Sequence, residues 1–348
     1  MVGDPVPFSF EESSPSVRLR VIRDLWQARP PEPLVREVLS QPEVARLLGS
    51  LRRDGTWGSW LHRAGLSTEN AITRLTELGC SFEGPLRRTV PPLLSVLKGA
   101  PASFLDLRQP VVMQVAITRV RRVAAGLLCQ IGLGEQEEIA RVVELEIARA
   151  HAFVRRARAS GLPIERRGLD GGRREPVYRS DVFDGDGLPV PDLYWLRAVA
   201  FSPLRRDPLV RDVLRFMAGP EYQQLAEADL GLVIVDGRRS RPGFGVRRLE
   251  PEQALRAGRM GEALVVSELL ARVGDPHPAR RLIRFLAQRR DARGHVELPR
   301  EAFARGGGYV IRQGWIRLTS PWRQRARAID LTFRLLLLER LSGGPHRD

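Results

Sequence analysis

The sequence predicts an all-α protein, arranged as an array of antiparallel helix pairs with one long irregular insertion and one segment that could form a small β-hairpin. Three observations favour this class: apolar residues recur at helical spacing along most of the chain, proline marks several helix starts, and glycine marks several helix ends. With 43% hydrophobic and 28% charged residues in a chain of 348, the composition is that of a globular protein able to bury a sizeable core.

Several predicted helices begin in the same way, with a polar residue followed directly by proline. The pairs are Ser14-Pro15, Gln41-Pro42, Asp207-Pro208 and Asp275-Pro276, each before an apolar-periodic segment. A proline in the first helical turn loses no hydrogen bond, because its missing N–H would have had no partner inside the helix. The recurrence of this start predicts an internal repeat of helical units.

Other predicted helices end alike, with an apolar residue and then glycine. This holds for residues 72–80, 124–134 and 265–275, as expected where a left-handed residue stops a helix. A last helix at 326–341 is apolar nearly all round, which predicts burial between neighbouring helices.

Two segments interrupt the helical pattern. Residues 155–192 are rich in Gly, Pro and Arg and predict a long irregular connection. Residues 230–251 contain a short β-branched run before a turn-like Gly-Arg-Arg-Ser-Arg-Pro-Gly segment, which predicts a small hairpin or an insertion. The predicted organisation is an N-terminal half at 1–160, a connection at 161–192 and a C-terminal half at 193–341, within one continuous domain.

One stretch, residues 46–62 (RLLGSLRRDGTWGSWLH), combines a helix end, a turn and two tryptophans. Gly55 tolerates the positive φ that a tight turn after Asp54 requires, and Trp57 can then fold back over the helix end. A degraded copy occurs at residues 285–296 (FLAQRRDARGHV), with Gln288 present and His295 in place of the tryptophan.

The Asp-Gly-Thr-Trp-Gly turn, the helix pairs and the C-terminal PWRQRARAIDLTFRLL segment resemble uncharacterised bacterial members of the squalene-cyclase and prenyltransferase-like α/α-toroid superfamily. The resemblance implies a ring of antiparallel helix pairs around a concave, partly apolar centre. The repeat departs from the family's pattern at Leu51, where the family carries a helix-capping Gln. The resemblance does not carry an activity to this chain, because no clear set of the prenyltransferases' Asp, Cys and His zinc ligands is present and the cyclases' Asp-x-Asp-Asp motif is absent. The nearest match contains Asp181, Asp184 and Asp186, with Gly187 at its last position.

The net charge of +15 raises the question of a nucleic-acid partner. Residues 280–348 hold sixteen arginines against six acids, and Lys98 is the only lysine of the chain, a skew that GC-rich coding also produces. Solvated helix faces with arginine stems over apolar surface explain the same pattern. The candidate anion-binding residues are Arg280, Arg281, Arg284, Arg323, Arg325 and Arg327.

Other residues are candidates for ligand binding or catalysis. The aromatic and histidine candidates for ligand binding are Trp57, Trp60, His62, Tyr194, Trp195, Trp315 and Trp322, although core packing is the commoner role of such aromatic residues. The weak catalytic candidates are Asp54, Asp181, Asp184 and Asp186; a solvated acidic loop accounts for the last three. The only two cysteines, Cys80 and Cys129, lack the spacing of a zinc site, so we expect neither a metal nor a cofactor.

Three classes of function remain. The first is a non-catalytic helical-repeat scaffold that binds a small apolar ligand or a protein partner in its concave centre. The second is an arginine-rich nucleic-acid-binding repeat protein, and the third is an enzyme acting on an isoprenoid or diphosphate substrate. The sequence shows no secretory signal and no apolar run long enough to span a bilayer, so we expect a cytoplasmic protein.

Overall fold

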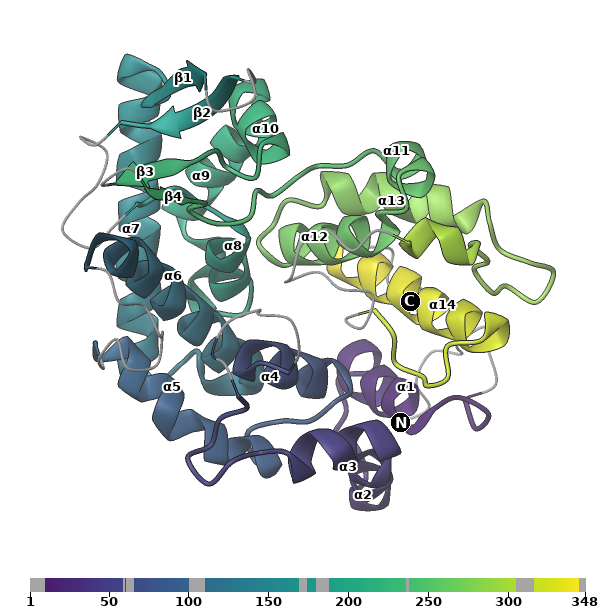
Figure 1. Cartoon of the computed structure of the whole chain (residues 1–348). Helices are drawn as coiled ribbons and strands as arrows, with labels where there is room; N and C mark the ends of the chain where they lie inside the picture. Colours follow the sequence, from purple (N-terminus) through teal and green to yellow (C-terminus); the bar gives the residue numbers. More distant parts are fainter. Residues whose placement is uncertain are drawn as a thin grey trace. The chain divides into compact units, whose positions relative to one another are not determined.

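The computed structural model describes residues 10–58, 60, 66–99, 110–168, 174–179, 188–235, 238–304 and 316–343. The protein is mostly helical, with 62% helix, as the sequence predicts. The chain divides into two compact units: unit 1 contains residues 1–88 and 249–348, and unit 2 contains residues 89–248 (Figure 1). The predicted connection at 161–192 lies within unit 2, and the segments on either side of it each contribute to both units.

Unit 1 joins the two ends of the chain. Its elements are α1 (Pro15–Arg20), the π-helical turn η1 (Val21–Leu25), α2 (Glu32–Ser40), α3 (Pro42–Gly49), α4 (Thr68–Glu77), α11 (Pro251–Arg256), α12 (Met260–Arg272), α13 (His277–Ala287), the 3-10 turn η7 (Arg300–Phe303) and α14 (Gln324–Leu341). A 3-10 turn, η2 (Pro85–Thr89), ends at the boundary between the units. Val17 and Val21 share an apolar cluster with Phe333 and Leu337 of α14, so the first and last helices form one core.

The predicted proline starts are observed. Helices α1, α3 and α9 (Pro208–Ala218) begin at the predicted prolines, and α13 begins one residue after Pro276. The Ser14 hydroxyl accepts a hydrogen bond from the Val17 amide, and the Asp207 carboxylate accepts one from the Leu209 amide. Side-chain caps of this kind satisfy the N–H groups that a helix start leaves without partners.

Two turns of unit 1 share one hydrogen-bonding pattern, and they fall in the two similar stretches of sequence. The Arg52 amide donates to the Thr56 carbonyl at 3.0 Å, and the Asp291 amide donates to the His295 carbonyl at 2.8 Å. Gly55 and Gly294 occupy the same place in the two turns, with φ values of 80° and 83°.

The residue after each turn is anchored in the same way. The amides of Trp57 and Val296 each donate to a threonine hydroxyl, on α4 (Thr68, 3.0 Å) and on α14 (Thr332, 2.9 Å) respectively. The indole of Trp57 folds back and donates to the Leu47 carbonyl in the last turn of α3 at 2.7 Å. The turn therefore ties the end of one helix to the next helix.

Unit 2 contains a helical core and two β-hairpins (Figure 1). Its elements are α5 (Val90–Leu97), α6 (Pro110–Leu128), the π-helical turn η4 (Cys129–Leu133), α7 (Glu137–Ser160), β1 (Ile164–Gly168), β2 (Arg174–Tyr178), α8 (Leu193–Ala200), the 3-10 turn η6 (Pro203–Arg206), α9, α10 (Pro220–Glu227), β3 (Val233–Val235) and β4 (Arg238–Ser240). The antiparallel β3–β4 pair confirms the hairpin expected within residues 230–251.

The antiparallel β1–β2 pair was not predicted. It lies in the segment at 155–192, which the sequence suggested was irregular, and α7 also extends into that segment as far as Ser160. Four of the five residues of β1 are exposed, so the strand lacks the apolar alternation that reveals a half-buried strand.

Candidate functional site

The candidate site lies in unit 1, where the chain enters α14. One buried carboxylate of that helix, Asp330, holds the preceding segment in place. Its Oδ2 atom accepts hydrogen bonds from the Leu318 amide (2.8 Å), the Thr319 amide (3.3 Å) and the Trp322 indole Nε1 (2.8 Å), and its Oδ1 atom accepts one from the Thr319 hydroxyl (2.9 Å). Asp330 is 0% exposed, so these donors take the place of water.

Trp322, a predicted ligand-binding residue, is the centre of an aromatic and cationic cluster. Its ring meets that of Phe303 edge to face, with centroids 5.1 Å apart. The guanidinium carbons of Arg317 and Arg327 lie 4.9 Å and 5.7 Å from its ring centroid, within the range of cation–π attraction. Because Asp330 fixes the indole nitrogen, the ring is a fixed support for both arginines.

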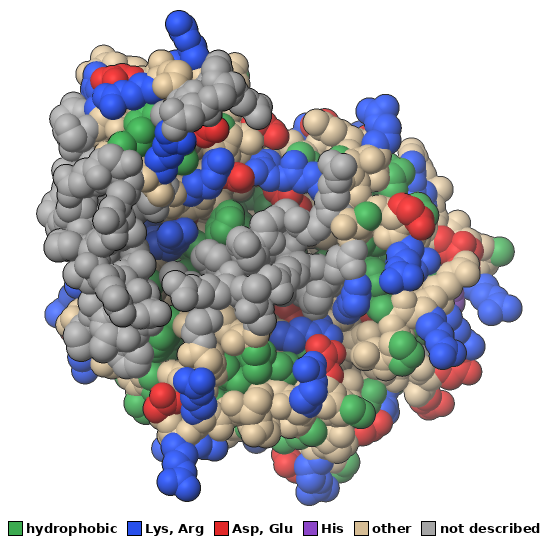
Figure 2. All heavy atoms as spheres, viewed as in Figure 1, with side chains coloured by type: hydrophobic (Ala, Val, Ile, Leu, Met, Phe, Trp, Pro, Cys, Tyr) green, Lys and Arg blue, Asp and Glu red, His purple; other side chains and the backbone are tan. Residues whose placement is uncertain are grey.

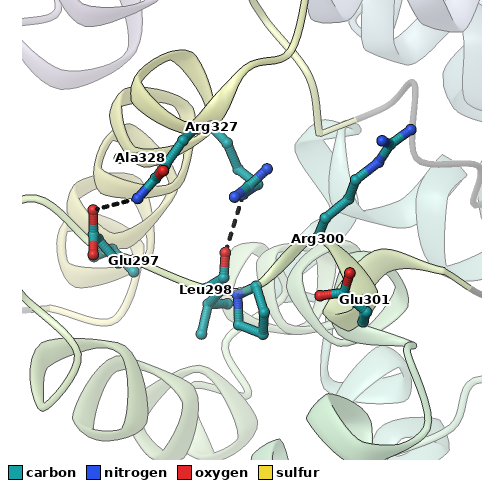
Figure 3. A pocket seen from close by; sticks show the side chains of 9 residues that line it. Glu297, Leu298, Arg300, Glu301, Arg327 and Ala328 are labelled. Carbon is teal, nitrogen blue, oxygen red and sulfur yellow. Dashed lines mark hydrogen bonds between the residues drawn. The ribbon is translucent and has the colours of Figure 1, made fainter.

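A pocket of about 510 Å³ opens beside this cluster (Figure 3). Residues 296–301 line one wall, and the first turns of α14 line the other with Gln324, Arg327 and Ala328. Figure 3 shows Arg327 extending from α14 toward Leu298, while Arg300 and Glu301 project from η7. Most of the lining side chains are polar or charged, so the pocket suits a polar ligand better than the apolar ligand expected from the sequence.

The two pocket arginines, Arg300 and Arg327, are not paired directly with the two glutamates, Glu297 and Glu301, that also line the pocket. Arg327 donates through Nε to the Leu298 carbonyl at 3.0 Å, which leaves its two terminal nitrogens available. Within the described ranges, neither Arg327 nor Arg300 forms an ion pair. Burial, together with the like charges of Arg74 and Arg300, lowers the pKa of the Arg317 guanidinium. An anion bound at Arg300 would reduce the repulsion between Arg300 and Arg317.

The other predicted anion-binding arginines do not line the pocket. Arg281 of α13 pairs with Glu250 at 2.5 Å, and Arg325 pairs with Glu12. The remaining three, Arg280, Arg284 and Arg323, are exposed on or beside α13 and α14. Arg300 was absent from the predicted set, although it belongs to the same arginine-rich segment. An isolated arginine at the first position of a short 3-10 turn has no neighbouring motif that marks it.

Four of the predicted aromatic residues are buried. Trp57, Tyr194 and Trp195 are 0% exposed and Trp60 is 5% exposed, so their rings pack within their own units. Trp195 donates its indole N–H to the Glu146 carbonyl at 3.2 Å, and Tyr194 meets Phe244 edge to face. These contacts are typical of core aromatics.

Asp54, the described catalytic candidate, supports its own turn. Its Oδ1 atom accepts from the Thr56 amide at 3.0 Å and from the Thr56 hydroxyl at 2.7 Å. The hydroxyl bond is the largest influence on the Asp54 carboxyl and lowers its pKa, so this group is a poor proton donor at neutral pH. The other candidates, Asp181, Asp184, Asp186, His62 and Trp315, lie outside the described residues.

A second charged cluster in unit 1 is internally paired. Glu77 of α4 accepts from Arg20 of α1 at 3.0 Å and from Arg334 of α14 at 2.5 Å. Arg334 also pairs with Glu268 of α12 at 3.1 Å. Burial opposes ionisation of Glu77, but the two arginines outweigh it and lower its pKa to about 2. We assign this cluster to helix packing rather than to ligand binding, since its charges neutralise one another.

Unit 2 has a related buried cluster. Arg122 of α6 pairs with Glu146 of α7 at 2.5 Å and donates to the Val190 carbonyl at 2.8 Å. Asp192 caps α8 by accepting the Trp195 amide at 2.8 Å. Burial raises the pKa of the Asp192 carboxyl. These contacts join α6, α7 and α8, so the cluster has a structural explanation.

Other chemistry finds little support in the structure. Burial raises the pKa of both thiols, Cys80 and Cys129, to about 12, so neither is a ready nucleophile. In the part of the chain that the structure describes, His, Cys, Asp and Glu side chains form no group suited to a metal ion. The described helices include none with both the length and the apolar character needed to cross a membrane.

Comparison with known protein families, with characterised proteins and with solved structures found no match to this chain. Its function must therefore be argued from the geometry of the site.

Proposed function

We propose that the chain is a non-catalytic helical-repeat protein, similar to α/α-toroids, whose unit 1 binds a small molecule through an anionic group. The binding site is the pocket between residues 296–301 and the start of α14. The observation that carries the proposal is that Arg300 and Arg327 both line this pocket without an ion-pair partner in the described structure. The N–H groups of a planar guanidinium can donate pairs of hydrogen bonds to the oxygens of a sulfate, phosphate or carboxylate group.

Several other arginines near the C-terminus are paired. Arg281, Arg290, Arg325 and Arg334, all in the arginine-rich C-terminal segment, each face an acid. On the face shown in Figure 2, basic and acidic side chains are interspersed. This distribution favours a local anion site over the continuous basic surface that nucleic acid requires. An enzyme acting on an isoprenoid or diphosphate substrate would use the same arginines, but Asp54 does not supply its acid.

The test is calorimetric titration of the purified protein with sulfate and with inorganic phosphate, at low ionic strength. We expect Arg300→Gln and Arg327→Gln each to weaken binding by about tenfold or more, because a hydrogen bond to a charged group is worth about 1.5–3 kcal/mol. Arg284→Gln is the matched control, since Arg284 is exposed on α13 and does not line the pocket.

Two results would count against the proposal. The first is the absence of anion binding to the unmodified protein. The second is equal weakening by all three substitutions, which would indicate a diffuse charge effect. Tight, steeply salt-dependent binding of short DNA or RNA that none of the three variants changes would instead favour the nucleic-acid class.

A further inference from the structure

Asp330 lies on α14 two residues beyond Ala328 and three beyond Arg327, both of which line the pocket. It is fully buried in α14, yet its carboxylate accepts four hydrogen bonds from the segment that carries Trp322. Trp322 in turn lies against Arg327, which lines the pocket. The carboxylate therefore holds the indole that supports Arg327, and it does not itself line the pocket.

The hydrogen bonds around Asp330 have two consistent arrangements. The Thr319 hydroxyl lies 2.9 Å from Asp330 Oδ1 and 3.1 Å from the Ser14 hydroxyl, which lies 3.1 Å from the Leu318 carbonyl. When the carboxylate is ionised, the Thr319 proton goes to Oδ1, and the single Ser14 proton can serve either Thr319 or the Leu318 carbonyl, so one of these two contacts lacks a proton. A proton on Oδ1 reverses the first bond. It completes a chain in which Asp330 donates to Thr319, Thr319 to Ser14, and Ser14 to the Leu318 carbonyl.

The surroundings of the carboxyl favour uptake of this proton near neutral pH. Burial raises the pKa of Asp330 to about 6, although the hydrogen bonds from Leu318, Thr319 and Trp322 and the charge of Arg334 oppose the rise. In the protonated state, Oδ2 still accepts its three bonds, so the segment keeps its position. What changes is the charge of the Asp330 carboxyl group, to which the Trp322 indole donates.

The charged groups around Asp330 come from several elements. Arg334 lies on the same helix and forms ion pairs with Glu268 of α12 and Glu77 of α4. Arg317, on the segment before α14, interacts electrostatically with Asp330. Ser14, the N-cap of α1, contacts Asp330 through the Thr319 hydroxyl. His295 precedes Val296, whose amide donates to Thr332 of α14, and it is the histidine for which the experiment needs a control.

We propose that Asp330 is a positioning residue of the pocket and that its protonation strengthens the binding of an anion by Arg300 and Arg327. This inference rests on the proposed anion-binding function. The ionised carboxylate partly offsets the positive charge of Arg317 and repels a bound anion, whereas the neutral acid does neither. By linkage, a bound anion must then favour the protonated form of Asp330 by the same factor.

The experiment uses sulfate, because its charge is constant over the pH range of interest. Calorimetric titrations at constant ionic strength and at several pH values from 5 to 8 compare the unmodified protein, Asp330→Asn and His295→Gln. Asparagine copies the protonated acid: its amide oxygen can accept the three bonds at Oδ2, while its NH₂ group donates to Thr319. We expect the unmodified protein to bind sulfate about fivefold more tightly at pH 5 than at pH 8.

Asp330→Asn should bind at every pH with the affinity that the unmodified protein shows at pH 5, and His295→Gln should keep the dependence on pH. A purely structural role for Asp330 would not give a tight, pH-independent variant. The inference is overturned if the unmodified protein binds sulfate with equal affinity at pH 5 and pH 8, or if Asp330→Asn keeps the dependence. No sulfate binding at any pH would instead refute the proposed function itself.

A second measurement needs no variant and so covers the case in which Asp330→Asn fails to fold. The ¹³C chemical shift of the Asp330 carboxyl is followed through a pH titration with and without saturating sulfate. We expect sulfate to move the midpoint to higher pH, and an unchanged midpoint would overturn the inference.

Discussion

Replacing Glu77 by glutamine should destabilise unit 1 strongly, because this carboxylate is the shared counter-ion of two buried arginines. Arg20 and Arg334 are each 3% exposed, and both bond to Oε2 of Glu77. In Glu77→Gln the two guanidinium groups lose the carboxylate between them, and each keeps one acid, Asp24 for Arg20 and Glu268 for Arg334. Breaking a buried ion pair from one side typically costs about 3–5 kcal/mol.

The pKa of Glu77 gives an independent magnitude. A carboxyl whose pKa falls from 4.5 to about 2 on folding contributes about 3 kcal/mol at neutral pH. Because the folded pKa is the lower one, this stability is fully present above pH 4.5 and is lost as the pH falls from 4.5 toward 2. The typical cost of breaking a buried ion pair and the value from the pKa shift agree. Both indicate that about 3 kcal/mol of the free energy of unfolding depends on the charge of Glu77.

Urea unfolding followed by circular dichroism, at neutral pH and at acidic pH down to 2, measures the effect. At neutral pH we expect Glu77→Gln to lower the free energy of unfolding by about 3 kcal/mol, and the difference from the unmodified protein should shrink as the pH falls. The control is Glu37→Gln, since Glu37 forms a partly exposed pair with Arg18 at 2.5 Å and should contribute at most about 1 kcal/mol. A Glu77→Gln variant as stable as the control, or a difference that persists at pH 2, would refute the reasoning.

Two further predictions concern the turn at Gly55 and the buried thiols. Replacing Asp54 and Gly55 by alanine should lower the melting temperature, because it removes both bonds to Thr56 and places a Cβ at a φ of 80°; an unchanged melting curve would remove the role assigned to the turn. Cys80 and Cys129, both buried with a pKa of about 12, should react with a thiol reagent only as the protein unfolds; rapid labelling of the native protein would contradict their burial.

Local signals in the sequence account for much of the helical structure. Proline after a capping residue located the starts of α1 and α9, and the Asp54-Gly55 pair located a turn. These features depend on neighbours within a few residues, so the sequence displays them directly. The pairing of the two chain ends could not be predicted in this way, since the bond from Ser14 to the Leu318 carbonyl joins residues 304 positions apart.

The residues of the candidate site differ in how far the sequence marks them. Trp322 and Arg327 stood out as residue types suited to ligand and anion binding; Arg327 lines the pocket, and Trp322 lies against Arg327. Arg300 did not stand out, because nothing local marks it. Asp330 was missed as well, because its role depends on hydrogen bonds from Leu318, Thr319 and Trp322. These donors come together around the carboxylate only in the folded chain.

The charges of α14 explain how a helix that is apolar nearly all round can have a defined orientation. Burial of apolar side chains alone would leave its rotation about its own axis open, because most faces offer a similar surface. Asp330 finds its four donors, and Arg334 finds Glu77 and Glu268, only when each side chain faces the segment or helices that carry these partners. The two residues lie four positions apart, so the same rotation satisfies both. The buried charges thus set the orientation that presents Arg327 to the pocket.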